Sequence, residues 1–279
     1  MDDQGVALTR RELWDLAGAR ALALEAAGVR RGDAVLIYLP NTLQWQVSLL
    51  ACLRVGAVPA TLPITTDAAT LTHIQGLVGA RAIIASPTSR RRPTGEAAHE
   101  AAVAGDRVTT LLLVDEDGTE AWSHVPGSRS DRVVPDGIDQ LMFTSSTTGL
   151  PKAVMHTADT MAAVNITFAD RFGVTEDTPI FMPSPLGHSV GAWHGGRLSL
   201  FTGATLVLQD VWDPVRALEI VDEYACVFTA AATPFLKDLV DAEWPAGQPK
   251  LASLRSFLCG GAPVPPSLLE QASAQAPQT

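Results

Sequence analysis

The chain has 279 residues, of which 47% are hydrophobic and 18% charged, as in an ordinary globular protein with a large buried core. Its formal net charge of −10 argues against nucleic acid as the main partner, because phosphate backbones are bound through lysine and arginine. No apolar run is long enough to span a bilayer, and the acidic amino terminus lacks the apolar core of a signal peptide. Cys52, Cys226 and Cys259 stand far apart in apolar stretches, so we expect buried free thiols and a cytoplasmic protein.

Helix and strand patterns alternate along the chain. A first helix is expected after Thr9, a favoured N-cap residue, and Gly28 ends it. Asn41 is expected to cap the second helix, which Gly56 ends. By the same criteria we expect helices over residues 10–27, 41–55, 70–78, 158–170, 214–223, 234–241 and from 266, and strands over 34–39, 58–64, 81–85, 108–114, 178–183, 204–208, 226–230 and 254–258. This alternation predicts an α/β fold with mostly parallel strands covered on both faces.

Residues 86–136 are less regular, and apart from the strand at 108–114 we expect loops there. The basic cluster Arg90 to Arg92 lies between Pro87 and Pro93 in polar surroundings. We interpret it as a solvated loop.

The stretch 141–154, LMFTSSTTGLPKAV, has the chemistry of a phosphate-binding loop. A short apolar run ends in five consecutive hydroxyl residues, Thr144, Ser145, Ser146, Thr147 and Thr148, which Gly149 and Lys152 follow. Hydroxyl and backbone N–H donors beside a lysine suit an anionic phosphate, although an ordinary surface turn uses the same residue types. It is not a Walker A loop, because Pro151 precedes Lys152 and Ala153 follows it.

This stretch resembles the signature loop of the AMP-forming adenylating enzymes: acyl-CoA synthetases, peptide-synthetase adenylation domains and luciferases. The family pattern is an aromatic residue followed by Thr-Ser-Gly-Thr-Thr-Gly-x-Pro-Lys-Gly, and the matching residues are Phe143, Thr144, Ser145, Thr147, Thr148, Gly149, Pro151 and Lys152. Ser146 and Ala153 stand where glycine is usual. The resemblance extends from near Leu8 almost to the end of the chain. It implies that Thr144 to Gly149, with Lys152, bind the pyrophosphate half of ATP.

Two further segments carry the resemblance. Residues 185–191, PLGHSVG, resemble the family's Pro-Leu-x-His-x-x-Gly segment, which implies that His188 contacts the substrate carboxylate. A histidine that is only structural is the alternative, and His194, which has no parallel in the family, is treated as background. Gly260, Gly261, Ala262 and Pro263 resemble the adenine-binding turn. A plain strand-to-helix turn would use the same residues.

The resemblance implies two packed sheet-and-helix layers from the large amino-terminal domain of an acyl-adenylate-forming ligase, of which residues 1–279 are an incomplete part. The family's magnesium-binding glutamate, ribose-binding aspartate and lysine-bearing carboxy-terminal domain have no counterparts here, so no metal ligand can be named and we expect this piece alone to be inactive. The implied reaction uses ATP and Mg²⁺ to convert a carboxylic acid to an acyl-adenylate. The acyl group then passes to coenzyme A or to a carrier-protein thiol.

Three alternatives stay open. The chain could be the adenylating loading domain of a multidomain synthase. It could also be a non-catalytic nucleotide-binding relic, which Ser146 permits. A P-loop kinase or NTPase is disfavoured, because the sequence lacks Gly-Lys-Ser/Thr at the loop.

Overall fold

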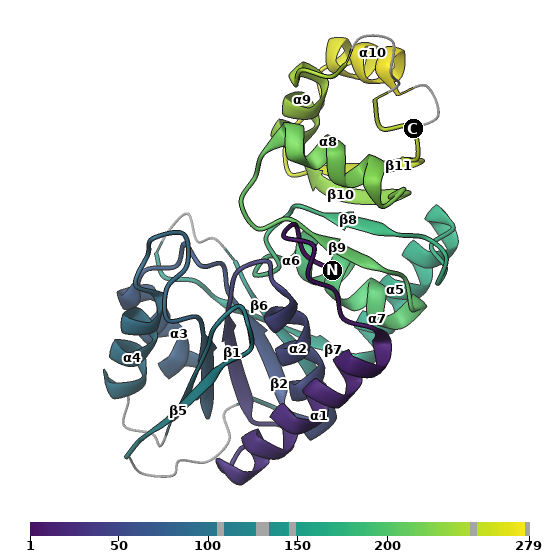
Figure 1. Cartoon of the computed structure of the whole chain (residues 1–279). Helices are drawn as coiled ribbons and strands as arrows, with labels where there is room; N and C mark the ends of the chain where they lie inside the picture. Colours follow the sequence, from purple (N-terminus) through teal and green to yellow (C-terminus); the bar gives the residue numbers. More distant parts are fainter. Residues whose placement is uncertain (105–108, 127–133, 145–148, 246–249, 277–279) are drawn as a thin grey trace. The chain divides into compact units, whose positions relative to one another are not determined.

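The computed structural model describes residues 1–104, 109–126, 134–144, 149–245 and 250–276. They form two compact units, each with its own sheet (Figure 1). The seven-stranded unit comprises Leu8–Ala162 and Leu186–His188. The four-stranded unit comprises Met1–Ala7, Ala163–Pro185 and the chain from Ser189 onward. Both units alternate strands and helices, which confirms the predicted α/β fold.

The seven-stranded sheet has the order β5-β4-β3-β1-β2-β6-β7. Its inner strands are parallel to one another, and β5 and β7 are antiparallel edge strands. The strands β1, β2 and β3 are fully buried, as their unbroken apolar runs require for strands covered on both faces. The bounds are β1 Ala34–Tyr38, β2 Val58–Thr61, β3 Ala82–Ala85, β4 Thr109–Val114, β5 Glu120–Val125, β6 Ile138–Phe143 and β7 Ala153–Thr157.

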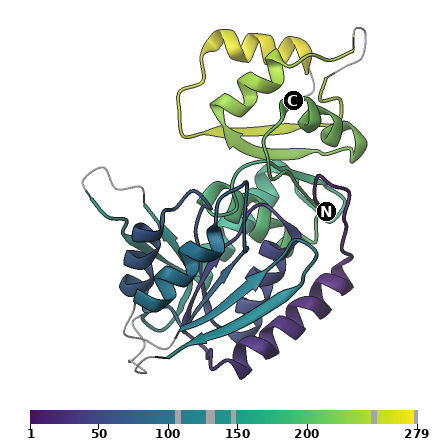
Figure 2. The ribbon, with the colours of Figure 1, turned by 60° about the vertical axis from the view of Figure 1, so that its left-hand side comes forward.

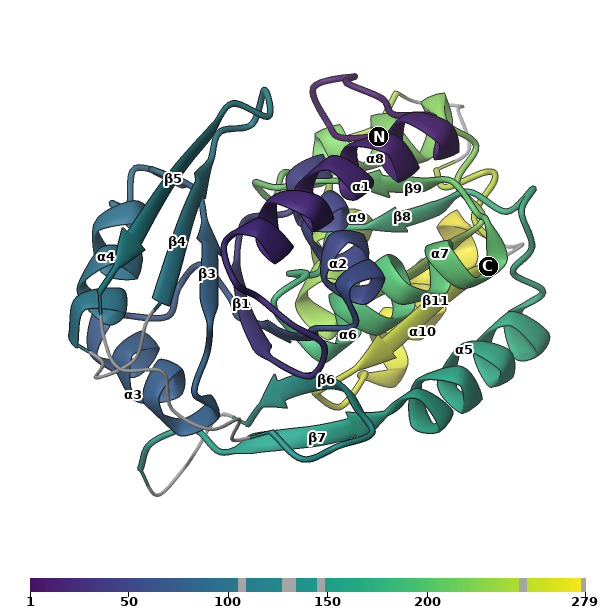
Figure 3. The same cartoon turned by 90° about the horizontal axis from the view of Figure 1, so that it is seen from below.

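Helices cover both faces of this sheet (Figure 3). One face carries α1 (Arg10–Ala26) and α2 (Leu43–Val55), and the other carries α3 (Ala68–Val78) and α4 (Thr94–Ala104). On the second face, Leu71 and Ile74 of α3 pack with Leu36 of β1 in one apolar cluster. The predicted cap of α1 is confirmed: the Thr9 hydroxyl accepts from the Glu12 N–H, and the Glu12 carboxylate accepts from the Thr9 N–H.

The four-stranded sheet is wholly parallel, with the order β11-β10-β8-β9. Phe181 packs with Leu218 and Val221 of α8 on one face, while Phe228 contacts the Phe172 ring of α5 on the other. Figure 2 shows the end of this unit, with α10 (yellow) above the strands. The bounds are β8 Ile180–Met182, β9 Leu206–Leu208, β10 Phe228–Ala232, β11 Ser256–Gly260, α5 Ala158–Phe172, α8 Pro214–Glu223, α9 Thr233–Asp241 and α10 Pro266–Gln275.

The segment after His188 is helical, which the sequence did not indicate. It contains α6 (Ser189–Gly191), a π-helix η1 (Ala192–Arg197) and α7 (Leu198–Thr202). Gly191 lies so close to the chain that a Cβ there would stand 2.4 Å from the Pro185 carbonyl oxygen. The glycine therefore permits the close approach at the start of this helix.

Two sequence-based predictions are wrong. Asn41 is not the cap of α2, because Thr42 occupies the N-cap position and the Asn41 side chain accepts a hydrogen bond from Leu186 instead. Residues 86–136 contain a helix, α4, and an edge strand, β5, besides the expected β4. All three cysteines are free, and Cys52 and Cys226 are buried as expected, whereas Cys259 is only partly buried. In the part of the chain that the structure describes, no helix has the length and apolarity to cross a bilayer.

Candidate functional site

The expected phosphate loop joins two antiparallel strands. Phe143 of β6 pairs with Ala153 of β7, and beyond this pair the Thr144 N–H donates to the Lys152 carbonyl oxygen at 3.1 Å. This bond closes the base of the loop at the carboxyl end of β6. Thr144 and Lys152 are exposed. The expected ligands Ser145, Ser146, Thr147 and Thr148 lie outside the described residues.

Gly149 has a conformation that other residues rarely adopt. Its φ is 152°, and no atom lies within 4 Å of where a Cβ would stand. The restriction at this position is therefore one of backbone conformation and not of space. The loop needs a glycine here to turn back toward β7.

His188 belongs to the seven-stranded unit together with Leu186 and Gly187, whereas the residues that flank this segment, Pro185 and Ser189, belong to the four-stranded unit. Two contacts attach its segment: the Leu186 N–H donates to Asn41 Oδ1 at 2.8 Å, and Gly187 packs on the backbone of Leu62. A Cβ on Gly187 would stand only 2.3 Å from the Leu62 carbonyl carbon and oxygen.

These contacts place His188 at the carboxyl edge of the sheet. Asn41 follows β1 and Leu62 follows β2, which pairs with β6 through Ala60 and Leu141. Because β2 and β6 are parallel neighbours, their carboxyl ends lie about 5 Å apart. The structure thus brings the segment of His188 and the base of the Lys152 loop to one edge of one sheet, the edge where open α/β folds bind ligands.

The His188 imidazole favours its neutral form. Its side chain is exposed on the whole, but the protein atoms around the ring lower its pKa below the ordinary value. At neutral pH it therefore offers one N–H donor and one acceptor nitrogen.

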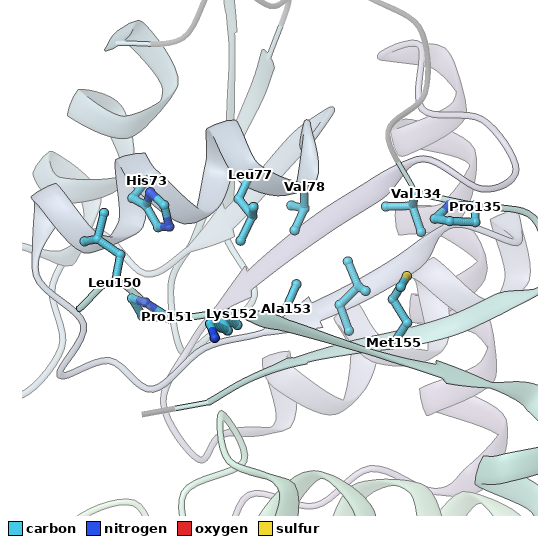
Figure 4. Close-up of a pocket in the computed structure, with 11 residues that line it drawn as sticks. His73, Leu77, Val78, Val134, Pro135, Leu150, Pro151, Lys152, Ala153 and Met155 are labelled. Atoms are coloured by element: carbon cyan, nitrogen blue, oxygen red, sulfur yellow. The ribbon is translucent and has the colours of Figure 1, made fainter. Parts of the chain in front are cut away.

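A pocket of about 450 Å³ lies beside the loop, between α3 and the β6–β7 hairpin (Figure 4). Helix α3 contributes one wall and the chain around Lys152 the other. Lys152 and His73 are the only titratable groups among its lining residues, which are His73, Leu77, Val78, Val134, Pro135, Leu141, Leu150, Pro151, Lys152, Ala153 and Met155. Lys152 therefore borders an apolar pocket.

The expected adenine turn, Gly260 to Pro263, lies in the four-stranded unit at the carboxyl end of β11. All four residues are exposed, and no atom lies within 4 Å of where a Cβ on Gly260 or Gly261 would stand. Gly261 has a φ of 86°, and the Ala262 carbonyl accepts from the Thr233 hydroxyl at 3.2 Å. The turn is fixed by that bond, and one face of its backbone is open.

The structure gives several residues roles that the sequence analysis did not assign to them. Asn41 and Gly187 attach the His188 segment, and Ser184 donates from its hydroxyl to the Ala230 carbonyl at 2.9 Å. His194 stacks on Phe168 with ring centroids 4.0 Å apart, and burial lowers its pKa to about 4. The only local signal was that Asn41 directly follows a strand.

A metal site of protein ligands alone is not found. Among the described residues, no group of three or more His, Cys, Asp or Glu side chains could hold a metal ion.

Comparisons with known proteins place this chain in a family. A family model described as AMP-binding enzyme matches residues 1–279. The medium-chain fatty-acid–CoA ligase of Escherichia coli (strain K12) is 29% identical over 277 residues, which are 95% of this chain and 48% of that protein. A feruloyl-CoA synthase of Amycolatopsis sp. is 30% identical over 268 residues, covering 95% of this chain and 51% of that one.

Solved structures share the fold. O-succinylbenzoate coenzyme A synthetase from Bacillus subtilis, in complex with AMP, has a TM-score of 0.77 at 23% identity and is matched over 97% of this chain and 66% of its own. ATP-bound MatB from Rhodopseudomonas palustris has a TM-score of 0.78 at 22% identity and is matched over 99% of this chain and 54% of its own. The chain spans about half the length of the curated relatives it matches. The resemblance seen in the signature loop is confirmed over the whole sequence, and the chain belongs to the AMP-binding enzyme family.

Proposed function

We propose that this chain binds ATP and a carboxylic acid and contributes to the formation of an acyl-adenylate, from which a thiol takes the acyl group. The observation that carries the proposal is the meeting of two segments at one sheet edge. The loop closed by Thr144 and Lys152 lies there, and Asn41 holds the segment of His188 at the same edge. The relatives named as CoA ligases support the same reaction class.

In the first step a carboxylate oxygen attacks the α-phosphorus of ATP. A new oxygen–phosphorus bond forms, the bond between the α- and β-phosphates breaks, and pyrophosphate leaves with its electron pair. Negative charge spreads over the phosphate oxygens, so cations and preorganised donors stabilise the transition state. We assign this role to the Lys152 ammonium and to the donors of Thr144 to Gly149. Mg²⁺, bound together with the ATP phosphates, would add positive charge.

His188 would orient the acid. A neutral imidazole can donate its N–H to one carboxylate oxygen without forming an ion pair that would hold the nucleophile too tightly. The lowered pKa of His188 supports the neutral form. Gly260, Gly261, Ala262 and Pro263 would accommodate the adenine ring, as their open backbone face suggests.

In the second step a thiol sulfur attacks the acyl carbon and a carbon–sulfur bond forms. The bond between the acyl carbon and the phosphate oxygen breaks, AMP leaves with that electron pair, and the thiol proton passes to water. Coenzyme A is the acceptor that we propose, with a carrier-protein arm as the alternative. The three free cysteines support a reducing compartment, and we propose the cytoplasm.

The test is acid-dependent exchange of radiolabelled pyrophosphate into ATP, measured on the protein encoded by the complete reading frame with a panel of carboxylic acids. We expect exchange with at least one acid, and its loss in Lys152→Ala. His188→Ala should raise the acid concentration at which exchange reaches half its maximal rate. His99 is an exposed histidine on α4, and His99→Ala should leave exchange unchanged. ATP binding without exchange for any acid would favour a non-catalytic nucleotide-binding protein, and no ATP binding at all would refute the proposal.

A further inference from the structure

Residues of α9, β11 and α10 (Figure 1) line a cavity of about 170 Å³ within the four-stranded unit. Aliphatic side chains form most of its wall, among them Leu236 and Leu239 of α9 and Leu251, which precedes β11. Phe257 of β11 adds an aromatic ring. Leu269 of α10 lines the cavity and is 51% exposed, so the cavity opens to solvent beside this residue.

The size and the lining of this cavity suit one small aromatic ring. Apolar cavities of about 150 Å³ hold no water and bind molecules of the size of benzene. A water molecule needs several polar partners to stay in a cavity, and an aliphatic wall offers it few. Phe257 favours an aromatic occupant, because two rings attract each other in offset and edge-to-face arrangements.

One polar atom beside the cavity has no partner. Gln275 of α10 is one of the lining residues, and its Oε1 atom is buried and accepts no hydrogen bond from the residues that the structure describes. A buried acceptor without a donor is unfavourable, because it has lost its water and gained nothing in return. A ring that carries one hydroxyl group could supply the missing donor. The cavity therefore favours a phenol over a hydrocarbon of the same size.

The wall of the cavity also carries an accessible thiol. Cys259 of β11 lines the cavity and is only partly buried, whereas Cys52 and Cys226 are buried. Burial also raises the pKa of the Cys226 thiol to about 12, which makes that residue unreactive. A thiol reagent should therefore distinguish Cys259 from the other two, and a molecule in the cavity should cover it.

Cys259 connects the cavity with the turn of residues 260–263. The Thr233 hydroxyl donates to the Ala262 carbonyl at 3.2 Å, and the Cys259 sulfur lies 3.4 Å from the same hydroxyl oxygen. Because the hydroxyl proton is used toward Ala262, the thiol is the donor in the second contact. A ligand that packs on Cys259 would support this chain of two contacts. It would thereby restrain the turn.

We propose that this cavity is an effector site for a small phenol, one aromatic ring with one hydroxyl group, and that its occupancy strengthens ATP binding. The coupling to ATP rests on the proposed function, in which residues 260–263 accommodate adenine, whereas the binding of the ring does not. A turn that is already restrained loses less freedom when adenine binds, so the two ligands should favour each other. A phenol has no carboxylate, and it is therefore not the acid that the enzyme would activate.

The first experiment measures the rate at which N-ethylmaleimide labels Cys259 in the protein encoded by the complete reading frame, by mass spectrometry of its peptides. At about ten times its Kd, p-cresol occupies about nine-tenths of the sites, so the labelling should slow about tenfold. Free glutathione in the same mixture should react at an unchanged rate, and Cys52 and Cys226 should stay unlabelled. Toluene lacks the hydroxyl group and should protect Cys259 only at higher concentration.

The second experiment is titration calorimetry of two variants of α10. Ala272→Leu fills part of the cavity, whereas Ala274→Leu adds the same side chain at an exposed position outside the lining and is the matched control. We expect Ala272→Leu to bind p-cresol about tenfold more weakly or worse and the control to bind it like the unsubstituted protein. Thermal unfolding shows that both variants are folded. The labelling experiment needs no variant.

The third experiment titrates ATP into the unsubstituted protein with and without saturating p-cresol. We expect ATP to bind about fivefold more tightly when p-cresol is present. Full labelling of Cys259 in the presence of p-cresol, or equal p-cresol affinity in the two variants, would overturn the site. Unchanged ATP affinity would overturn its role as an effector site. Failure of the proposed function would instead appear as no ATP binding under either condition, with the binding of p-cresol unaffected.

Discussion

Replacement of Gly187 by alanine should displace the segment that carries His188. The added Cβ would stand 2.3 Å from the carbonyl carbon and oxygen of Leu62, against at least 3.4 Å for an ordinary contact, so the backbones must separate by about 1.1 Å. Only backbone atoms are in the way, and no flexible side chain can move aside. Overpacking of this kind costs about 1–3 kcal/mol. Breaking the buried bond from Leu186 to Asn41 would cost about 1–3 kcal/mol more.

We therefore expect Gly187→Ala to lower the free energy of unfolding by about 2–5 kcal/mol in urea titrations followed by circular dichroism. Gly76→Ala is the matched control: Gly76 lies in α3 with no atom within 4 Å of where a Cβ would stand, so alanine should stabilise the chain by about 0.5–1 kcal/mol. The stability of Gly195→Ala should lie between those of the other two variants. A Cβ on Gly195 would stand 2.7 Å from the Met182 side chain, which is flexible and can adjust. If Gly187→Ala matched the stability of Gly76→Ala and kept full pyrophosphate exchange, the contact would be unimportant and our account of the His188 segment wrong.

Three other substitutions test the remaining arguments. Lys152→Ala should weaken ATP binding by roughly 10- to 100-fold in calorimetry, through loss of a charge-assisted contact, whereas Lys237→Ala, an exposed lysine of α9, should not. Folding lowers the pKa of His194 from 6.5 to about 4, so between these pH values the unfolded state binds more protons than the folded state. The contribution of His194 to the free energy of unfolding is therefore fully present above about pH 6.5 and is lost as the pH falls toward 4. The stability difference between pH 7.5 and pH 5 should shrink by about 2 kcal/mol in His194→Gln, and an unchanged difference would show that His194 titrates normally. Arg20→Met should cost about 1–3 kcal/mol in urea titrations, since it removes the buried guanidinium that donates to the Gln44 carbonyl and to Ser48 Oγ; a neutral result would mean that these hydrogen bonds are dispensable.

Where the sequence carried a strong local signal, the structure agrees closely. The helix α8 (Pro214–Glu223) has the predicted bounds, because Pro214 favours the first turn and the Asp213 side chain caps it. The strands β1, β2 and β3 were visible as apolar runs because parallel strands covered on both faces need no alternation. The observed strands are shorter than predicted, because the hydrogen bonds between strands end before the apolar runs do.

Elements with weak patterns were missed, and the reason is physical. The buried face of α4 consists of small residues, among them Ala98, Ala101 and Ala102, so its hydrophobic period is faint. The strand β5 lies at a sheet edge and is largely exposed, and its sequence EAWSHV therefore reads as polar. Its partner β4 supplies the pairing, which is a tertiary contact that no local pattern records.

One part of the candidate site could be predicted from local sequence, and another part could not. The loop around Lys152 was recognisable because its hydroxyl residues, glycine and lysine follow one another in a local pattern, and the backbone conformation of Gly149 is one that favours glycine. The location of His188 was not recognisable, because it depends on two contacts between residues far apart in sequence. These are the bond from Leu186 to Asn41, which are separated by 145 positions, and the packing of Gly187 on Leu62. Asn41 looked like a helix cap since that is what an asparagine after a strand most often is.

The interpretation of Arg90 to Arg92 as a solvated loop came from the flanking prolines and the polar surroundings, and all three arginines are exposed as predicted. Composition does not indicate the left-handed backbone conformation of Arg90 and Arg91. That conformation belongs to a turn that Ser89 and Arg92 close with two backbone hydrogen bonds, and a bonded pair of this kind leaves no periodic signal in the sequence.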